Sequence, residues 1–132
     1  MSKADMIFDA IVEGDLDELQ KQLEADPLLI NAVGRDNLTP LHIAAREDKT
    51  DIAAWLIAHG ADLQAVDGKH GATPLGWAAY YGKAETVRTL LETGANPSHK
   101  NRYGLTPYQV AEEGVQGKWE DSSATPEDYR RV

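Results

Sequence analysis

Apolar residues recur along the chain with the period of an α-helix, in short segments that come in pairs. In one pair, Leu75 and Ala78 share a face of the first segment, and Val87 and Leu90 share a face of the second. Spacings of three and four residues place side chains on one helical stripe. Gly82 stands between the two segments, where a glycine in the left-handed conformation ends a helix readily. The pattern therefore predicts an all-α chain made of short helix pairs.

The start of the first helix in each pair recurs at a nearly constant interval. The heptapeptide TPLHIAA at residues 39–45 returns as TPLGWAA at 73–79, which is 34 residues later. It returns again as TPYQVA at 106–111, a further 33 residues along. Threonine is a good N-cap residue, and proline suits the first helical position because no hydrogen bond is lost there. A period in this range predicts a stack of similar supersecondary units.

The period divides the chain into four units and a tail. The first unit lacks the Thr-Pro signal, as expected of a terminal unit that has one face in water. The last unit stops after one helix, and we expect Trp119 in the tail to be partly buried against that end. The repeats are predicted to occupy residues 1–116, in units of about 4–33, 34–67, 68–100 and 101–116, and residues 117–132 form a C-terminal tail or cap.

Short polar segments join one unit to the next. Asn37, Gly71 and Gly104 occupy the same place in three of these segments, and all three residue types tolerate a positive φ. We therefore predict short β-hairpin-like fingers between the units, the second of which carries the one extra residue of the 34-residue spacing. The predicted fingers are residues 34–38, 68–72 and 101–105.

Taken together, these motifs resemble those of the ankyrin-repeat family. The resemblance rests on TPLHIAA at residues 39–45 with HGAD at 59–62, and on TPL at 73–75 with GAN at 94–96. It covers about residues 4–116, which is nearly the whole chain. The combination of the period with these motifs is highly specific.

The resemblance implies an α-solenoid of helix pairs with hairpin-like fingers at right angles to them. It also implies the binding of another protein through the finger tips and the concave groove. The stretch LEADPLLINA at residues 23–32 is similar to that of small stand-alone ankyrin proteins of bacteria. Gly76 and Gln109, where the family prefers histidine, and Asp48, where it prefers glycine, depart from the pattern.

Charge and composition restrict the classes of partner. The 132 residues have a formal net charge of -9 and no cysteine. Nucleic acid is not expected as a partner, because phosphate binding needs a surplus of Lys and Arg. The N-terminal sequence resembles neither a signal peptide nor a membrane anchor, so we expect a cytoplasmic protein that does not bind membranes. Residues 1–67 hold 14 acidic and 5 basic side chains, which leaves open an inhibitor or immunity-type role toward a basic protein.

No motif predicts catalysis, a cofactor or a metal site. None of the four histidines has another at i+3 or i+4, and no nucleophile elbow or phosphate loop occurs. The resemblance gives His42 a structural role, in which it ties a finger to a helix by hydrogen bonds. We therefore expect no enzyme activity. A small-molecule or enzymatic site in the groove is the less favoured alternative, since it would require a deep pocket, and a merely shallow groove would argue against it.

The residues predicted to bind a partner lie in the fingers and directly after the Ala-Ala pairs. Arg35, Lys69 and Arg102 are expected to form a row on successive fingers. Tyrosine and arginine dominate binding hot spots, although Tyr81 has the alternative of packing on Trp77. The partner is an unidentified protein, and the chain is expected to be a monomer, with self-assembly as an alternative. The predicted set is Arg35, Asp36, Arg46, Lys69, His70, Tyr80, Tyr81, Arg102 and Tyr103.

Overall fold

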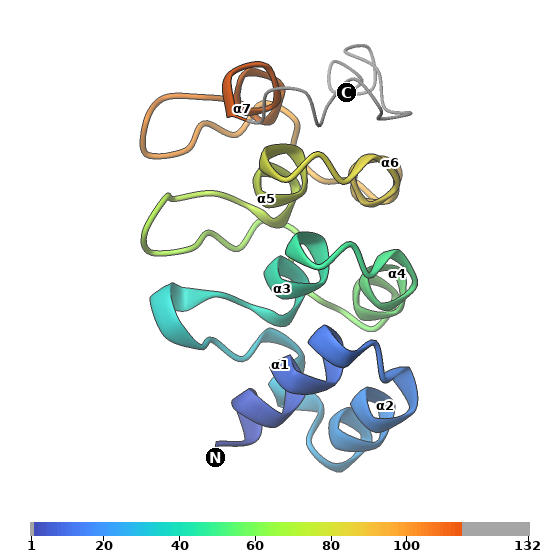
Figure 1. The fold of residues 1–132 in the computed structure, drawn as a ribbon. Coiled ribbons are helices and arrows are strands. Elements are labelled where there is room, and N and C mark those ends of the chain that lie inside the picture. Colours follow the sequence, from blue (N-terminus) through green and yellow to red (C-terminus); the bar gives the residue numbers. More distant parts are fainter. Residues whose placement is uncertain (1, 115–132) are drawn as a thin grey trace.

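The computed structural model describes residues 2–114, which fold into four stacked tiers (Figure 1). Each of the first three tiers is a pair of α-helices, and the fourth is a single helix. The regular elements in this part of the chain are all helical, which confirms the predicted all-α solenoid. They are α1 (Lys3–Glu13), α2 (Leu16–Ala25), α3 (Pro40–Arg46), α4 (Thr50–Ala58), α5 (Pro74–Tyr80), α6 (Ala84–Glu92) and α7 (Pro107–Gly114), with the 3-10 helices η1 (Pro27–Asn31) and η2 (Arg35–Asn37).

The first helices of the tiers form one column and the second helices form another (Figure 1). Helices α1, α3, α5 and α7 pack on one another in chain order, and α4 packs on α6. The fingers project from the first column, on the side away from α2, α4 and α6 (Figure 1). We call the side formed by the fingers and the first helices the finger face, and the side formed by α2, α4 and α6 the outer face.

Side-chain caps mark the starts of α1, α3 and α5, and the two threonine caps are those that the sequence predicted. Ser2 Oγ accepts a hydrogen bond from the Asp5 backbone N–H at 3.1 Å, and the Asp5 carboxylate accepts one from Ser2 N at 3.2 Å. Thr39 and Thr73 each accept a hydrogen bond from the backbone N–H three residues on, at 3.3 Å. Asp48 follows α3 with a positive φ of 55°, the conformation that glycine takes after other first helices. Asp48 therefore takes the place of the family's glycine without a change in the backbone conformation of this turn.

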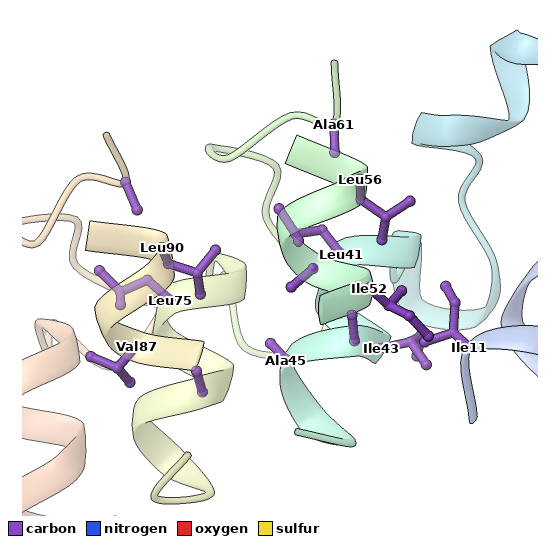
Figure 2. Close-up of a cluster of buried hydrophobic side chains, with 14 of the residues drawn as sticks. Ile11, Leu41, Ile43, Ala45, Ile52, Leu56, Ala61, Leu75, Val87 and Leu90 are labelled. Carbon is purple, nitrogen blue, oxygen red and sulfur yellow. The ribbon is translucent and has the colours of Figure 1, made fainter. Parts of the chain in front are cut away.

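An apolar core runs through the tiers (Figure 2). Leu41 and Leu75 hold the same position in successive units and are 1% and 0% exposed, with Leu56 and Leu90 buried beside them. Burying a side chain of this size contributes about 1.5–3 kcal/mol to stability. The predicted alanines of the first helices are also buried, which lets neighbouring helices approach closely. The predicted apolar stripes are thus confirmed, although Leu16, Ile57 and Leu91 of the second-helix stripes are only partly buried.

The fingers are chain reversals that contain no β-strand within residues 2–114. The middle finger spans one residue more than the other two, as the spacing predicted. Asn37, Gly71 and Gly104 have φ values of 57°, 62° and 77°, so the predicted left-handed positions are confirmed. One backbone hydrogen bond of 2.9–3.0 Å closes each finger, from the N–H of Gly34 to the carbonyl of Leu38, from Asp67 to Ala72, and from Asn101 to Leu105.

The two ends of the stack differ. At the N-terminal end, η1 takes the place of the usual short exit from a helix pair and contacts α1, α2 and α3. At the other end, the predicted tail with Trp119 lies outside the described residues, so its burial stays a prediction. No helix within residues 2–114 has the length and apolar character needed to cross a lipid bilayer.

Candidate functional site

Adjacent fingers are joined by backbone hydrogen bonds. Gly68 N donates to the Asp36 carbonyl at 2.6 Å, and Arg102 N donates to the His70 carbonyl at 2.8 Å. The Arg102 guanidinium also donates to the Gly68 carbonyl at 2.6 Å. Arg102 therefore binds the neighbouring finger, although the residue is exposed. A residue that the sequence assigned to partner binding thus also holds two fingers together.

Asp67 is a buried carboxylate that organises the middle finger, and it is only 2% exposed. Its Oδ2 accepts hydrogen bonds from the backbone N–H groups of Lys69 and His70, at 3.1 and 2.8 Å. Its Oδ1 accepts from the backbone N–H of Ala72 at 2.8 Å and from the indole N–H of Trp77 at 3.2 Å. Both oxygens therefore serve the finger, and the Trp77 contact ties the finger to α5.

These donors also set the charge of Asp67. Burial acts to raise the pKa of this carboxyl group, but the hydrogen bonds from Ala72, His70 and Trp77 outweigh burial and hold the pKa below its ordinary 3.8. The His70 ring adds to the effect, since its Nδ1 lies 3.2 Å from Oδ2. Asp67 is therefore ionised at neutral pH, and its charge is directed toward the finger backbone.

His42 joins the second tier to the middle finger and is completely buried. Its Nδ1 lies 2.8 Å from Thr39 Oγ1, and its Nε2 lies 2.9 Å from the Ala72 carbonyl. A carbonyl oxygen only accepts, so Nε2 carries the proton. Burial lowers the pKa of His42 below the usual 6.5, although the Ala72 carbonyl and the Asp67 charge act in the opposite direction. The neutral ring is therefore favoured, and the structural role predicted for His42 is confirmed.

A groove of about 530 Å³ hollows the finger face between the middle and third fingers. The two fingers form its sides, and the remaining lining residues lie in α5 and α7 or in the segments that adjoin α5 and the third finger. We call it the aromatic groove after the rings that line it. These are His70, Trp77, Tyr80, Tyr81, His99 and Tyr103.

The rings of the groove contact one another. The Trp77 ring centroid lies 6.0 Å from that of Tyr81 and 6.1 Å from that of His70. Tyr80 meets Tyr81 edge to face at 5.0 Å, and Tyr103 lies 6.3 Å from His70. Aromatic pairs of this kind add about 0.5–1.5 kcal/mol beyond their buried area. The rings therefore support one another, while Tyr80 and Tyr103 stay 47% and 64% exposed at the rim.

The groove brings together five of the nine residues that the sequence predicted to bind a partner. Tyr81 is half-buried and packs against Trp77, which was the alternative for this residue, so it does not simply face solvent. Of the other four, Tyr80 lies at the exposed rim, Lys69 and His70 lie in the middle finger, and Tyr103 lies in the third finger. The five are Lys69, His70, Tyr80, Tyr81 and Tyr103.

The other four predicted residues do not line the groove. Arg35 and Asp36 are exposed in the first finger. Arg46 is half-buried, and its guanidinium forms an ion pair of 2.9 Å with Glu47. Arg102 lies on the third finger and is engaged with the neighbouring finger, as described above. The structure thus gathers the predicted residues of the middle finger and of the end of α5, together with Tyr103 of the third finger.

Several lining residues were not assigned to binding by the sequence. Gly76 leaves room in the groove, and its only signal was its departure from the histidine of the family pattern. Trp77 was not among the residues predicted to bind a partner, yet it contributes a ring to the groove. His99 lines the groove while its Nε2 donates to the Gly71 carbonyl at 2.9 Å. No periodic signal marked His99, because its place depends on how two fingers stack.

Comparisons with known proteins agree with this architecture. A family described as "Ankyrin repeats (3 copies)" matches residues 7–111. The "Ankyrin repeat and SAM domain-containing protein 6" of Rattus norvegicus is 32% identical over 104 residues, which are 79% of this chain and 12% of that protein. The "E3 ubiquitin-protein ligase XB3" of Oryza sativa subsp. japonica is 41% identical over 90 residues, which are 67% of this chain and 20% of that protein.

A third relative is the "Protein phosphatase 1 regulatory subunit 12A" of Mus musculus, which is 37% identical over 83 residues, 63% of this chain and 8% of that protein. The chain thus spans a fifth or less of the length of each of these three relatives. The similarity therefore concerns the repeats, which in general are protein–protein interaction modules, and not the whole activities of those proteins. With its stacked helix pairs, its fingers and a family match over residues 7–111, the chain belongs to the ankyrin-repeat family.

Proposed function

We propose that this protein binds another protein through the finger face, with the aromatic groove at the centre of the interface. The observation that supports this most is the meeting of five predicted binding residues around one hollow. Aromatic residues are enriched at the centres of interfaces and among hot spots. The fingers are already joined by hydrogen bonds, so binding does not have to order them, and little conformational entropy is lost.

The groove favours a partner surface that carries carboxylates beside an apolar patch. Lys69 and His70 line the groove, and no acidic residue does so within the described part of the chain, although the sequence has a net charge of -9. Complementary charge raises association rates and excludes wrong partners. A basic partner, as in the inhibitor alternative, would instead meet the acidic half of the chain, residues 1–67. The groove chemistry therefore favours the first kind of partner.

Binding of a small molecule in the same groove is a second candidate. A volume of about 530 Å³ falls within the range of about 300–1,000 Å³ seen for ligand pockets, so the hollow is not the shallow groove that would argue against a ligand. Such pockets usually enclose most of the ligand surface. Here the rim residues Tyr80 and Tyr103 are exposed, which suits a protein surface better.

Affinity capture from the source cell tests the proposal when three baits are compared. Wild type, Tyr103→Ala and Lys21→Ala are the baits, because Tyr103 is an exposed rim residue and Lys21 is an exposed residue of α2 on the outer face. The captured partner should bind Tyr103→Ala at least about 1 kcal/mol more weakly by calorimetry, which is the scale of an important interface residue. Lys21→Ala should bind like the wild type. The opposite ranking would place recognition on the outer face and contradict the proposal.

Tyr81→Ala and Arg102→Ala are also expected to weaken binding by at least about 1 kcal/mol each. Both side chains make contacts within the chain as well, to Trp77 and to the Gly68 carbonyl. Thermal melts of these two variants must therefore accompany the binding data, whereas Tyr103→Ala gives the cleaner comparison.

A further inference from the structure

Gly76 leaves a place unfilled that the preceding tier fills with a ring. In the second tier, the His42 ring spans from α3 to the Ala72 carbonyl at the base of the following finger. One repeat later, the residues at these two positions are Gly76 and Leu105. Both line the aromatic groove. The groove therefore opens where a histidine ring closes the corresponding space between α3 and the middle finger.

The backbone of α5 does not require a glycine at this place. Gly76 lies inside the helix and is absent from the positions with positive φ. A Cβ atom added there would lie 3.3 Å from Ala72 Cβ and 3.9 Å from Thr73 Oγ1, so a shift of a few tenths of an ångström would admit it. Glycine within a helix is destabilising relative to alanine. What this glycine provides is space in the groove.

The surroundings of this space have a defined chemistry. The Trp77 and Tyr81 rings stand on the α5 side, and Leu105 and Val110 add apolar surface. Lys69 supplies a positive charge from the middle finger, and no carboxylate is among the described lining residues of the groove. The buried Asp67 beneath the finger is held by four N–H donors of the finger and α5, so it does not contribute to the lining.

We propose that the space beside Gly76 receives an aromatic side chain of the partner protein, from a segment in which acidic residues flank that side chain. The inference rests on the proposed function and specifies its chemistry. The partner ring packs between the aromatic wall of α5 and the third finger, where edge-to-face and stacked contacts favour a ring over an aliphatic chain. The flanking carboxylates meet Lys69 and His70 of the middle finger. Gly76 thus determines specificity by its lack of a side chain.

A phage-displayed library of random dodecapeptides tests this inference, with the wild-type chain and Gly76→His as parallel targets. Gly76→His places an imidazole at the position that His42 holds in the preceding tier, so the variant should melt at or above the wild-type temperature. Peptides enriched only on the wild type should carry an aromatic residue flanked by Asp or Glu. A synthetic peptide of the most enriched sequence should lose at least about tenfold in affinity on Gly76→His and none on Lys21→Ala.

A second measurement does not depend on the variant folding. In an NMR titration of the wild type with the synthetic peptide, the amide signals of Gly76 and Leu105 should shift, and that of Lys21 should not. Equal enrichment on both targets, basic enriched peptides, or unshifted Gly76 and Leu105 signals would overturn the inference. Binding that appears only after residues 115–132 are removed would also overturn it, because the chain's own terminus would then be the occupant.

Failure of this inference and failure of the proposed function are distinguishable. If a captured partner is lost from Tyr103→Ala but is retained by a folded Gly76→His, the finger face still carries recognition and only the pocket beside Gly76 is wrong. If Tyr103→Ala retains the partner as well, the proposed function fails with it.

Discussion

Two buried polar residues, His42 and Asp67, hold the fingers to the helices behind them. The motif pattern pointed to His42, because the family uses this histidine as a hydrogen-bonded link. Nothing in the sequence pointed to Asp67, whose role arises from the extra residue of the middle finger. In the shorter third finger, one oxygen of Asn101 accepts from Tyr103 N and Leu105 N, whereas Asp67 uses both of its oxygens.

Replacing His42 tests the link at the residue scale. His42→Gln should lower the unfolding free energy by about 1–3 kcal/mol at pH 7, because buried polar partners are left imperfectly paired. The folded-state pKa of His42 lies below the usual 6.5, so the unfolded chain binds more protons in acid. The contribution of His42 to the unfolding free energy is therefore fully present above about pH 6.5. It is lost as the pH falls through the lower pKa of His42 in the folded state.

Urea denaturation of the wild type and of His42→Gln from pH 8 to pH 4.5 measures this difference. The stability gap between the two proteins should narrow as the pH falls. A gap that widens on acidification would mean that the buried ring is charged in the folded state.

Asp67→Asn is expected to destabilise the protein by about 1–3 kcal/mol, because an amide nitrogen cannot accept from the backbone N–H groups that one carboxylate oxygen serves. The folded-state pKa of Asp67 lies below 3.8, so its stabilising contribution is present above about pH 3.8 and is lost as the pH falls below that value. This pH range lies below the one in which the contribution of His42 begins to be lost. Asn101→Asp is the matched control, because one carboxylate oxygen still serves both donors there. Thermal melts should show the smaller change for Asn101→Asp, and equal changes would contradict the role given to Asp67.

At the scale of elements, the helices and their order followed from the sequence. The Thr-Pro starts, the glycine stops and the apolar stripes placed the helix pairs, since each rests on interactions within a few residues. The fingers were located at the right residues and described as hairpin-like, but no strand forms in them within residues 2–114, and their backbone hydrogen bonds are those of turns. The aromatic groove was not predicted, because it depends on a side chain that is missing at Gly76 and on contacts between fingers that are far apart in the sequence.

The stacking of the elements predicts the cost of removing one buried leucine. Leu75→Ala should lower the unfolding free energy by about 2–5 kcal/mol, the usual range for a leucine in a packed core. Leu28→Ala is a matched control, because Leu28 is 87% exposed in η1, and its effect should stay within about 0.5 kcal/mol. Both are measured by chemical denaturation. The assigned repeat register is wrong if the two variants unfold at the same denaturant concentration.

For the whole molecule, the first half of the chain and the aromatic groove differ in charge. Acidic residues outnumber basic ones in residues 1–67, while the aromatic groove of the later tiers has Lys69 and no carboxylate among its described lining residues. Among the described helices, α1 packs on α3, α3 on α5 and α5 on α7, and so short a stack should unfold nearly as one unit. A partner bound across two fingers and α5 therefore stabilises the whole array by mass action.

Hydrogen–deuterium exchange of the chain alone and in complex with the captured partner tests the central claim most directly. The account predicts added protection in the middle and third fingers, residues 68–72 and 101–105, and in α5, where backbone amides lie under the bound surface. The amides of α2, on the outer face, should exchange as in the free protein apart from any uniform gain in stability. Protection concentrated in α2 and α4, with the fingers unchanged, would contradict the account.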